Sequence, residues 1–489
     1  MDNRQLFLEK AGALKPCLHV ETVRPATGLP EAALSEGDSV VLDFGNHFVG
    51  RFSMKLGSRG SHPDAPAWLR FKFCENAREL DETLEGYRGW ISKGWVQTEE
   101  THVDVLPAII SLPRRYAFRY VRIDVLALSS KYRLTLEDVW AETTTSAVDA
   151  AVARFTGDEG DAAIDGVALR TLRSCMQSVF EDGPKRDRRL WLGDLRLQAL
   201  ANYATYRNND LVKRCLYLFA GVADDEGCLP ACLFLEPKVE ADDTFMFDYA
   251  LFFIPTLLEY LRQTGDRAAA LELLPTALKQ LELSERRFDG DLVRDSDQLG
   301  WCFVDWNLDL NKQACAQAIW LYCGKSAIEL CERLCVESPD GLSSMLARRR
   351  SAMREAWFDP ALGVFVSGEG RQVSWATQVW TVLAGVVEGE DAANCLDAVG
   401  AIPDAVDMVT PYMMHHYVEA LCLVDRRAEA RRVMRDYWGA MVDLGADTFW
   451  ELFNPEDPDE SPYGSPVVNS YCHAWSCTPT WFLRSGMLS

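Results

Sequence analysis

The chain has 489 residues, of which 48% are hydrophobic and 25% charged, as in a soluble globular protein with more than one domain. Its formal net charge of −23 argues against nucleic acid and membrane partners, since both bind clustered Lys and Arg. No apolar run reaches the ~20 residues of a membrane span, and the charged N-terminus is unlike a signal peptide. We expect a cytoplasmic protein whose 15 cysteines are reduced thiols, with no metal and no cofactor.

Short β-type runs dominate residues 39–143. Apolar and polar residues alternate within each run, and clusters of Gly, Pro, Asp and Ser separate the runs. The predicted strands are Ser39–Gly45, Phe48–Leu56, Ala67–Phe73 and Arg119–Leu128. Several such strands at short spacing favour a β-sandwich over residues 1–150, with its boundary near residues 148–155.

Helical periodicity takes over after this boundary and continues through residues 151–489. The predicted helices cover residues 166–179, 195–207, 210–222, 248–263, 267–287, 311–332, 343–357, 373–387, 413–423 and 427–444. Turn residues join them in pairs, which favours a closed toroid of inner and outer helices. An open solenoid is the alternative, but the sequence has no fixed-period repeat. We expect the site in the hollow that the loops at one end of the toroid surround.

The first candidate site segment is residues 181–198, EDGPKRDRRLWLGDLRLQ. It opens on a Gly-Pro turn signal and leads into a helical pattern, so we interpret it as a loop that precedes a helix. Its candidates are Asp182, Arg186, Asp187, Trp191 and Asp194. Carboxylates with cations and an indole ring favour sugar binding over packing, although Asp194 could also cap the helix.

A second segment, GADTFWELF at residues 445–453, places Glu451 next to Phe449 and Trp450. Desolvation by two aromatic rings raises the pKa of a carboxyl, which suits acid or base catalysis. The equal alternative is that both rings belong to the core and that Glu451 faces water.

Two further segments combine polar groups with tryptophan. GWCFVDWNL, at residues 300–308, holds Asp305 and Trp306, which suit the hydroxyls and the face of a sugar; a helix cap at Asp305 is the alternative. NSYCHAWSCTPTWFL, at residues 469–483, holds His473 in an apolar run, where a histidine is more often a core residue than a catalyst. The sequence has no nucleophile-elbow serine and no Gly-rich phosphate loop, which excludes phosphoryl transfer and dinucleotide binding.

The motifs DGPKRDRRLWLGD, VDW, GADTFWE and NSYCHAWS occur in this order along the chain. Together they resemble the bacterial α-L-rhamnosidase family of inverting glycoside hydrolases. The resemblance implies an (α/α)6 barrel over residues 151–489, behind an N-terminal β-sandwich. It implies an enzyme that releases terminal α-L-rhamnose from small rhamnosides or oligosaccharides. The alternatives are a related hydrolase or lyase for another deoxy or uronic sugar, and a non-catalytic sugar-binding protein.

The resemblance also implies a role for each matching residue. Asp187 matches the general acid, which is a glutamate in many members, and Glu451 matches the general base. Because aspartate is shorter than glutamate, the acid role could instead fall to Asp182. The residues expected around the sugar are Asp182, Arg186, Trp191, Asp194, Asp305, Trp306, Trp450 and His473, with the three tryptophans as candidates for an apolar wall against the C6 methyl group.

The charges near Asp187 oppose one another in the sequence. Arg186 and Arg188 flank it and lower the pKa of a carboxyl, whereas Asp182 and Asp194 raise it. The sequence leaves the balance open. It also leaves open the linkage, the aglycone, the role of the sandwich at the site, and the oligomeric state, for which a homodimer is one option.

Overall fold

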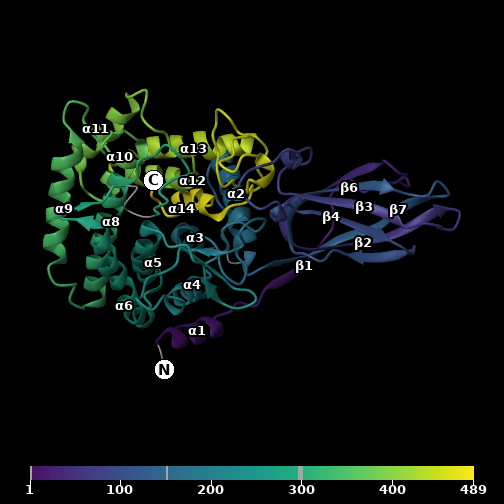
Figure 1. The fold of residues 1–489 in the computed structure, drawn as a ribbon, viewed down its shortest axis with the longest axis horizontal. Helices are drawn as coiled ribbons and strands as arrows, with labels where there is room; N and C mark the ends of the chain where they lie inside the picture. The colour runs from purple at the N-terminus through teal and green to yellow at the C-terminus, as the bar shows by residue number, and fades with distance from the viewer. Residues whose placement is uncertain (1–2, 150–151, 296–300) are drawn as a thin grey trace.

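The computed structural model describes residues 3–149, 152–295 and 301–489. Figure 1 shows two parts that lie end to end, with the strands at one end and most of the helices at the other. The protein is therefore a mixed β and α chain, in which an N-terminal sheet domain precedes a helical domain. The predicted boundary between residues 150 and 151 lies outside the described residues.

The sheet domain contains one antiparallel sheet in the order β1-β7-β2-β6-β3-β4, with β5 paired to β2. Its strands are β1 (His19–Val23), β2 (Ser39–Gly60), β3 (Ala67–Cys74), β4 (Thr98–Val103), β5 (Ala108–Ser111), β6 (Tyr116–Ala127) and β7 (Tyr132–Thr145). Alternate side chains along the strands are buried and form a hydrophobic core of their own.

Strand β2 takes part in both halves of the sheet. Its residues 39–43 and 48–50 pair with β6, and residues 50–60 pair with β7. The register shifts between Asp43 and Phe48, where Gly45 has a φ of 80°, a left-handed conformation that favours glycine. The sequence predicted two separate strands here, and the structure joins them through this irregularity.

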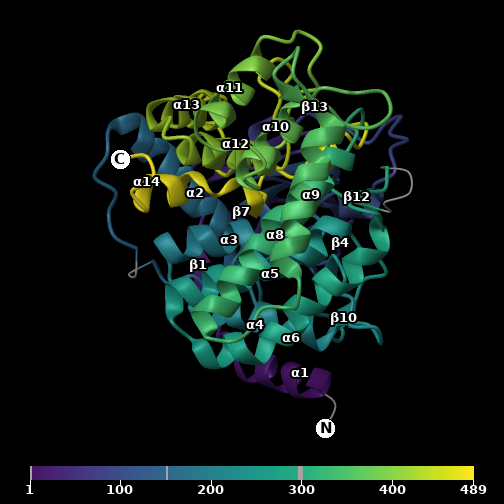
Figure 2. The ribbon, with the colours of Figure 1, turned by 90° about the vertical axis from the view of Figure 1, so that its left-hand side faces the viewer.

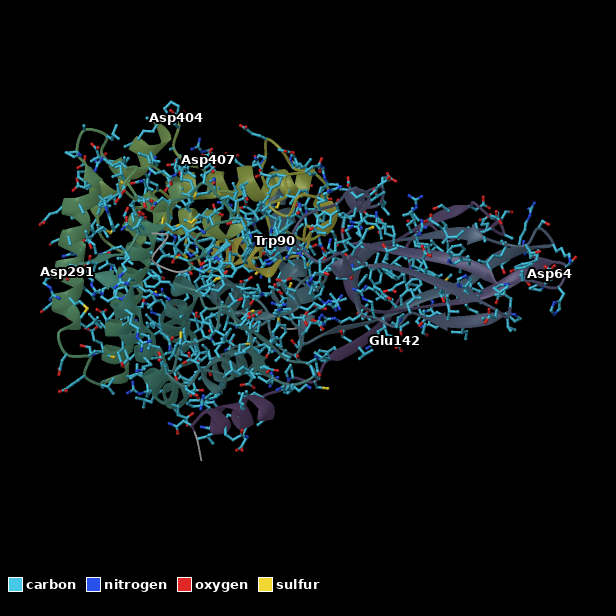
Figure 3. All side chains as sticks on the ribbon, in the orientation of Figure 1. Asp64, Trp90, Glu142, Asp291, Asp404 and Asp407 are labelled. Atoms are coloured by element: carbon cyan, nitrogen blue, oxygen red, sulfur yellow. The ribbon has the colours of Figure 1, made fainter. Side chains whose placement is uncertain are left out.

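Between β3 and β4 the chain leaves the sheet and crosses to the helical domain. We call residues 75–97 the excursion; its 3-10 helices are η1 (Ala77–Glu79) and η2 (Lys93–Trp95). Tyr87 and Ile91 are buried in a small apolar cluster with Tyr463 and two valines of the helical domain. The excursion thereby carries Trp90 away from the strands and over the helices (Figure 3).

The helices of the helical domain are α2 (Glu159–Cys175), α3 (Leu192–Ala204), α4 (Asn209–Gly221), α5 (Phe247–Thr264), α6 (Arg267–Ser284), α8 (Gln313–Leu334), α9 (Leu342–Trp357), α10 (Trp375–Leu383), α11 (Gly389–Gly400), α12 (Pro411–Leu423), α13 (Arg427–Asp443) and α14 (Pro479–Arg484). The shorter elements between them are β8 (Leu190–Trp191), β9 (Cys232–Phe234), β10 (Glu240–Ala241), η4 (Glu285–Arg287), β11 (Phe288–Asp289), β12 (Leu292–Val293), β13 (Phe358–Asp359), β14 (Val364–Phe365), η5 (Pro466–Val468) and η6 (Ala474–Ser476).

Consecutive helices pack as pairs, as the sequence predicts: α3 with α4, α5 with α6, α8 with α9, α10 with α11, and α12 with α13. The first members of these pairs also contact one another, in the order α3, α5, α8, α10 and α12. They are buried almost all round, which is typical of helices inside a domain. Helix α14 contacts α2 and α3, so the end of the chain returns to the start of the helical domain.

Helix α1 (Asn3–Ala13) comes before the sheet domain in sequence but packs on α4 of the helical domain, as Figures 1 and 2 show. Phe7 stacks on Tyr217 with ring centroids 5.8 Å apart. Arg214 of α4 donates a hydrogen bond to the carbonyl of Ala11. The predicted assignment of residues 1–150 to one domain therefore did not foresee where the first helix lies.

Two expectations from composition concern the whole chain. Within the residues that the structure describes, no helix is both long enough and apolar enough to cross a membrane. All 15 cysteines are free thiols.

Candidate active site

A cavity of about 270 Å³ lies where the excursion meets the helical domain. Four of its lining residues carry carboxyl groups: Asp182, Asp187, Asp194 and Glu451. The sequence-predicted site residues that line it are Asp182, Arg186, Asp187, Trp191, Asp194, Trp306, Glu451 and His473. The structure therefore brings most of the predicted set into one hollow; Asp305 and Trp450 lie outside its lining.

Backbone hydrogen bonds join the three segments around Asp182, Glu451 and His473. The N–H of Glu451 donates to the carbonyl of Ser470 at 3.0 Å, and the N–H of His473 donates to the carbonyl of Phe449 at 2.9 Å. The N–H of residue 474 donates to the carbonyl of Asp182 at 2.8 Å. Segments nearly 300 positions apart in sequence are thus fixed relative to one another by main-chain contacts.

Gly183 permits this close approach. A Cβ at this position would lie 2.7 Å from the Ser470 hydroxyl and 2.8 Å from the carbonyl oxygen of Arg186. Gly183 belongs to the Gly-Pro dipeptide that predicts a turn. The glycine is also needed because no side chain fits at this position.

The loop that follows sends consecutive side chains in different directions. Lys185 enters the interface between the domains, Arg186 reaches Glu451, and Asp187 lines the cavity. Asp187 and Arg188 have φ values of 58° and 57°, in the left-handed region that costs an L residue about 1–2 kcal/mol. The surrounding contacts hold this strained turn, and it is what separates the three side chains.

Arg186 connects Asp187 to Glu451. Its guanidinium forms an ion pair with one Glu451 oxygen, and its Nη1 lies 3.6 Å from Oδ1 of Asp187. Its Nε donates to the carbonyl of Val468 at 3.0 Å, and the other Glu451 oxygen accepts a hydrogen bond from the Tyr463 hydroxyl. Two carboxyl groups therefore flank a single buried cation, and both line the cavity.

The structure decides the balance of charges around Asp187. Burial raises the pKa of its carboxyl, Arg186 lowers it, and Glu451 raises it again, with a net upward shift. Arg188 takes no part in this balance, because its guanidinium points away and donates to a main-chain carbonyl of the sheet domain at 2.9 Å. The arrangement favours a protonated Asp187 more than its flanking arginines suggest.

Asp182 and Asp194 lie deeper in the cavity wall. Burial raises the pKa of both carboxyls well above the ordinary value, and nearby carboxylates add to the increase. Oδ1 of Asp182 accepts a hydrogen bond from the N–H of Arg189 at 3.0 Å. Asp187 is the more accessible acid, with 20% of its side chain exposed against 4% of residue Asp182.

Several buried polar atoms of the cavity wall have no hydrogen-bond partner within the described protein. They include Oδ1 of Asp194 and Nδ1 of His473, which lie 3.7 Å apart, the indole N–H groups of Trp191 and Trp306, and Nε of Arg189. An unpartnered buried polar group costs about 1–3 kcal/mol, so such atoms gather at few places in a protein. Their convergence on one cavity indicates a ligand that offers several hydrogen-bonding groups.

Aromatic rings form much of the remaining wall. Phe303 stacks on Trp475 at a centroid distance of 5.4 Å and meets the edges of Trp306 and Tyr249 at 5.2 and 5.8 Å. Tyr249, Phe303 and Trp475 were not among the predicted site residues. Phe303 and Trp475 had a local signal, since they lie in the segments of Trp306 and His473, whereas Tyr249 had none.

Asp305 anchors a loop and does not line the cavity. Its Oδ1 accepts a hydrogen bond from the Thr410 hydroxyl at 2.6 Å, and its Oδ2 accepts one from the N–H of Val409 at 2.9 Å. Burial raises the pKa of Asp305 to about 6, although these bonds lower it. Asp305 was expected at the sugar; in the structure it ties the loop that carries Trp306 to the start of α12 and is absent from the cavity lining.

Trp450 belongs to the core, which is the alternative that the sequence analysis weighed for this segment. It is 1% exposed, and its ring packs against those of Tyr471 and Phe453 at 5.1 and 5.5 Å. Its neighbour Glu451 points the other way, into the cavity. The expected apolar wall therefore keeps Trp191 and Trp306 but loses Trp450.

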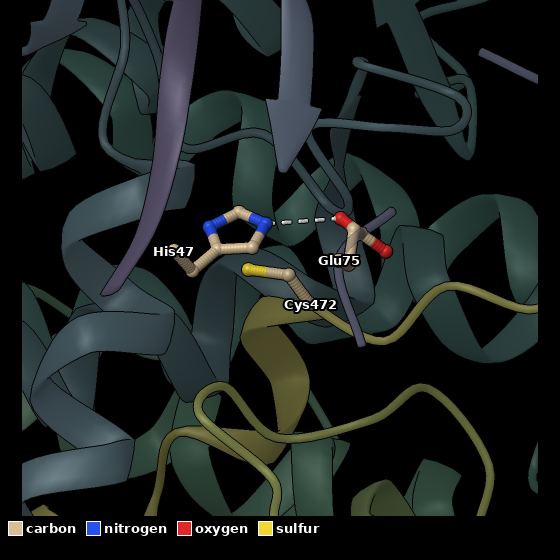
Figure 4. A group of neighbouring side chains, drawn as sticks. All are labelled: His47, Glu75 and Cys472. Atoms are coloured by element: carbon tan, nitrogen blue, oxygen red, sulfur yellow. Dashed lines mark hydrogen bonds and ion pairs between the residues drawn. The ribbon is translucent and has the colours of Figure 1, made fainter. Parts of the chain in front are cut away.

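A buried charge cluster joins the sheet domain to the site loops. Figure 4 shows His47 and Glu75 facing each other, 3.3 Å apart, beside Cys472. The second Glu75 oxygen accepts a hydrogen bond from the N–H of Tyr471 at 2.8 Å and lies 3.7 Å from the ammonium group of Lys185. Glu75 thus contacts both the loop of Asp187 and the segment of His473 from the other domain.

Two groups of side chains bring possible metal ligands within 4.8 Å of one another: His47, Glu75 and Cys472, and His415, His416 and Glu419. In the first group Glu75 is bound to protein partners that include a lysine. In the second, Arg196 donates to Glu419 at 3.1 Å and lies 2.9 Å from His416. A buried cation beside each group disfavours a metal ion there, and we assign one to neither.

Two family models match the chain. The glycosyl hydrolase family 78 α-rhamnosidase N-terminal domain matches residues 11–143, and the bacterial α-L-rhamnosidase six-hairpin glycosidase domain matches residues 162–487. Among curated proteins, no relative matches at a significant level.

Solved structures include a near neighbour. A rhamnosidase from Klebsiella oxytoca with rhamnose bound is 47% identical, with 99% of this chain and 98% of that chain covered and a TM-score of 0.95. A family 78 rhamnosidase from Bacillus sp. GL1 is 23% identical, with 92% and 46% covered and a TM-score of 0.77. An α-L-rhamnosidase from Streptomyces avermitilis is 16% identical, with 96% and 44% covered and a TM-score of 0.68. The last two show a likeness of fold alone.

Proposed function

The chain belongs to the bacterial α-L-rhamnosidase family of glycosyl hydrolase family 78, and from this premise we propose that Asp187 and Glu451 are its acid and base pair. Membership makes the protein a glycoside hydrolase that releases rhamnose. One observation carries the proposal: two carboxyl groups from distant segments flank one guanidinium in the same cavity. Neither the motifs nor the fold alone would require that meeting.

The helical domain is an (α/α)6 barrel in this proposal, with the sheet domain folded as a sandwich beside it. The contact order α3, α5, α8, α10 and α12 gives five inner helices, each paired with an outer one. Helix α14 contacts α3 and pairs with α2, which supplies the sixth pair, and α13 contacts α2, which closes the ring on its outer side. The site segments are then loops around the mouth of the barrel.

Asp187 is the general acid. An acid must hold its proton at the working pH, and the pKa of the Asp187 carboxyl is shifted upward by burial. Asp182 has a pKa raised further, but it is less exposed and its Oδ1 already accepts a main-chain hydrogen bond. Asp182 therefore binds the sugar, and Asp187 donates a proton to the leaving oxygen.

Glu451 is the general base. It is ion-paired with Arg186 and hydrogen-bonded by Tyr463, which orients its carboxylate at the cavity. An inverting hydrolase needs its two carboxyls ~6.5–9.5 Å apart so that a water molecule fits beneath the sugar. The guanidinium of Arg186 contacts both carboxyls and keeps Asp187 and Glu451 from direct contact, as such a spacing requires. We propose that water activated by Glu451 attacks the anomeric carbon on the face opposite the leaving group.

The polar atoms without partners bind the rhamnose hydroxyls. Oδ1 of Asp194 and Nδ1 of His473 lie side by side and can each form a hydrogen bond with a sugar hydroxyl. His473 is neutral, because burial and Arg186 lower its pKa well below the usual value. The methyl group at C6 lies against the rings of Trp191 or Trp306. A cavity of about 270 Å³ suits one terminal sugar, so the substrates are small rhamnosides or oligosaccharides.

The test is to incubate the protein with nitrophenyl glycosides of several sugars, including a uronic and a second deoxy sugar, and to follow the products by proton NMR. We expect turnover of the α-L-rhamnoside alone, with β-L-rhamnose as the first anomer formed. First appearance of the α anomer would refute the inverting mechanism. Preferred cleavage of another glycoside would favour the related-enzyme alternative, and rhamnose binding without turnover would favour the sugar-binding alternative.

A further inference from the structure

The sheet domain contributes part of the cavity wall. Trp90, Ile91, Ser92 and Trp95, all from the excursion, line the cavity together with residues of the helical domain. The excursion leaves the sheet at the end of β3 and returns at β4. The domain without any of the proposed catalytic residues therefore shapes the place where the substrate binds.

The tip of the excursion is held in place. The Tyr87 hydroxyl donates to the carbonyl of Ile91 at 3.0 Å, which fixes the turn around Trp90. A Cβ on Gly89 would lie 1.8 Å from the carbonyl oxygen of Tyr463, so the main chains of the two domains touch here. Only glycine allows that contact. Trp90 is positioned by the main chain on both sides and not by its own burial.

Trp90 nevertheless remains largely accessible. Its ring lies 5.3 Å from that of Tyr463 and 6.3 Å from that of Trp306, yet 66% of the residue is exposed. Trp301, which also lines the cavity, is 49% exposed. Two exposed indole rings beside one cavity are unusual for a protein surface, and such exposed aromatic surface marks a binding site.

The two ends of the cavity differ in chemistry. The unpartnered polar atoms belong to the helical domain, around Asp194 and His473, and suit the hydroxyls of the terminal sugar. The side chains that the excursion adds are apolar or aromatic except for Ser92. Trp90 and Trp301 line the same cavity and are exposed, so their rings are available to a group attached to a sugar at the polar end.

We propose that Trp90, together with Trp301, forms a platform for a flat aromatic aglycone, so that the sheet domain selects the leaving group of the rhamnoside. This inference rests on the proposed function. A second sugar as the aglycone is the less favoured occupant, because its hydroxyls would need hydrogen-bond partners that the excursion does not supply.

The experiment compares Trp90→Ala with the unchanged protein on three substrates: 2-naphthyl α-L-rhamnoside, methyl α-L-rhamnoside and a rhamnosyl-glucose disaccharide. Taking the ratio of kcat/KM between the two proteins for each substrate cancels the leaving-group chemistry. We expect kcat/KM to fall about three- to tenfold for the naphthyl compound and less than twofold for the other two. Trp90→Phe should recover most of the loss.

Trp68→Ala is the matched control, since Trp68 is an exposed tryptophan of the same domain that stacks on His102 on the sheet and does not line the cavity. It should leave all three values unchanged. An equal fall for all substrates, no fall, or a larger fall for the disaccharide would overturn the aromatic platform.

Binding separates this inference from the proposed function. If the unchanged protein turned over no rhamnoside, the function would fail, but calorimetry could still compare 2-naphthyl α-L-rhamnoside with rhamnose. A gain in affinity from the naphthyl group that Trp90→Ala abolishes supports the platform. Equal affinities of the two proteins for the naphthyl compound would refute it.

Discussion

Buried polar and charged groups lie on two sides of the loop from Asp182 to Asp187. They have protein partners on one side, and some of them lack a partner on the other. On the side that faces the sheet domain, Lys185 lies 2.5 Å from Glu79 and 3.7 Å from Glu75, so the charges compensate one another. On the cavity side, Asp194 and His473 carry buried polar atoms without a protein partner. The two arrangements involve residues from distant parts of the chain that meet at this one loop.

This difference separates two roles of buried polar groups: those with protein partners stabilise the fold, and those without partners can bind a ligand. Removing one partner of a buried ion pair strongly lowers the free energy of unfolding, because the other charge remains buried without a partner. Uncompensated polar atoms lower the stability of the folded state and persist where a substrate satisfies them. Substitutions on the two sides should therefore change different properties, and the following predictions run from the largest effect to the smallest.

On the cavity side, Glu451→Gln should give the largest loss. Glutamine keeps the shape, and its one carbonyl oxygen can still accept a hydrogen bond from Arg186 while its amide N–H donates to the Tyr463 hydroxyl, but it cannot take a proton from water. We expect kcat to fall about 10³-fold with an unchanged far-UV circular dichroism spectrum. Glu456→Gln is the control, since Glu456 is an exposed glutamate five positions further along the chain. Substantial turnover by Glu451→Gln would remove this residue from the mechanism.

Asp187→Asn should cause a loss that depends on the leaving group. Without its acid, the protein should cleave a methyl rhamnoside about 10²–10³-fold more slowly but lose much less on a dinitrophenyl rhamnoside, whose leaving group needs no proton. Asp182→Asn provides the comparison within the same loop, and we expect its loss to be equal on both substrates. A leaving-group dependence in Asp182→Asn instead would move the acid role to that residue.

On the interface side, Lys185→Met should chiefly affect stability. It leaves Glu75 and Glu79 without their shared cation, and we expect the free energy of unfolding in urea to fall by about 3 kcal/mol. Lys131→Met is the matched control: Lys131 lies 2.6 Å from Asp64, but both side chains are exposed, so the loss should stay below about 1 kcal/mol. Equal losses in the two variants would contradict the assignment of Lys185 to a buried interface.

Asp194→Asn should abolish rhamnose binding yet raise the melting temperature slightly, by about 2 °C at pH 7.5. The folded-state pKa of Asp194 is raised by burial and by Glu451, so the folded protein binds its proton more tightly than the unfolded chain. The free energy of unfolding therefore falls as pH rises above the unfolded value of about 3.8, and this penalty is fully present above the folded pKa. Asparagine removes it.

The pH dependence checks that argument. The difference in melting temperature between Asp194→Asn and the unchanged protein should shrink toward zero as pH falls to about 3, below the unfolded value, where the carboxyl is largely protonated in both states. A difference that is constant with pH, or a destabilisation at pH 7.5, would show that Asp194 is not an uncompensated acid.

Most of the helices were predictable because their side-chain periodicity is local. The predicted range 248–263 corresponds to α5 (Phe247–Thr264), and 427–444 corresponds to α13 (Arg427–Asp443). Helix α1 was missed, because its burial depends on α4, more than 200 positions away. Likewise, two predicted strands are one in the structure, since a shift in register interrupts the pattern without ending β2.

The site was predictable where motif and resemblance coincided, as for Asp187 and Glu451, whose meeting in one cavity is a matter of tertiary structure. Asp305 and Trp450 were assigned to the sugar because a carboxylate and an indole look alike whether they face a ligand or the core. Only their contacts, with Thr410 and Tyr471 among others, separate the two cases. Trp90 could not be predicted as a site residue, because no local sequence pattern indicates that residues 75–97 reach the other domain.

The docking of α1 on α4 means that the polypeptide crosses between the two domains at both ends of the sheet, once before β1 and once after β7. These two chain connections, together with the contact made by the excursion, restrict hinge motion between the domains. We therefore expect the sheet domain to act as a fixed wall beside Trp90. Substrates would then be selected by their fit to an opening of constant width, and not by a movement that closes over them.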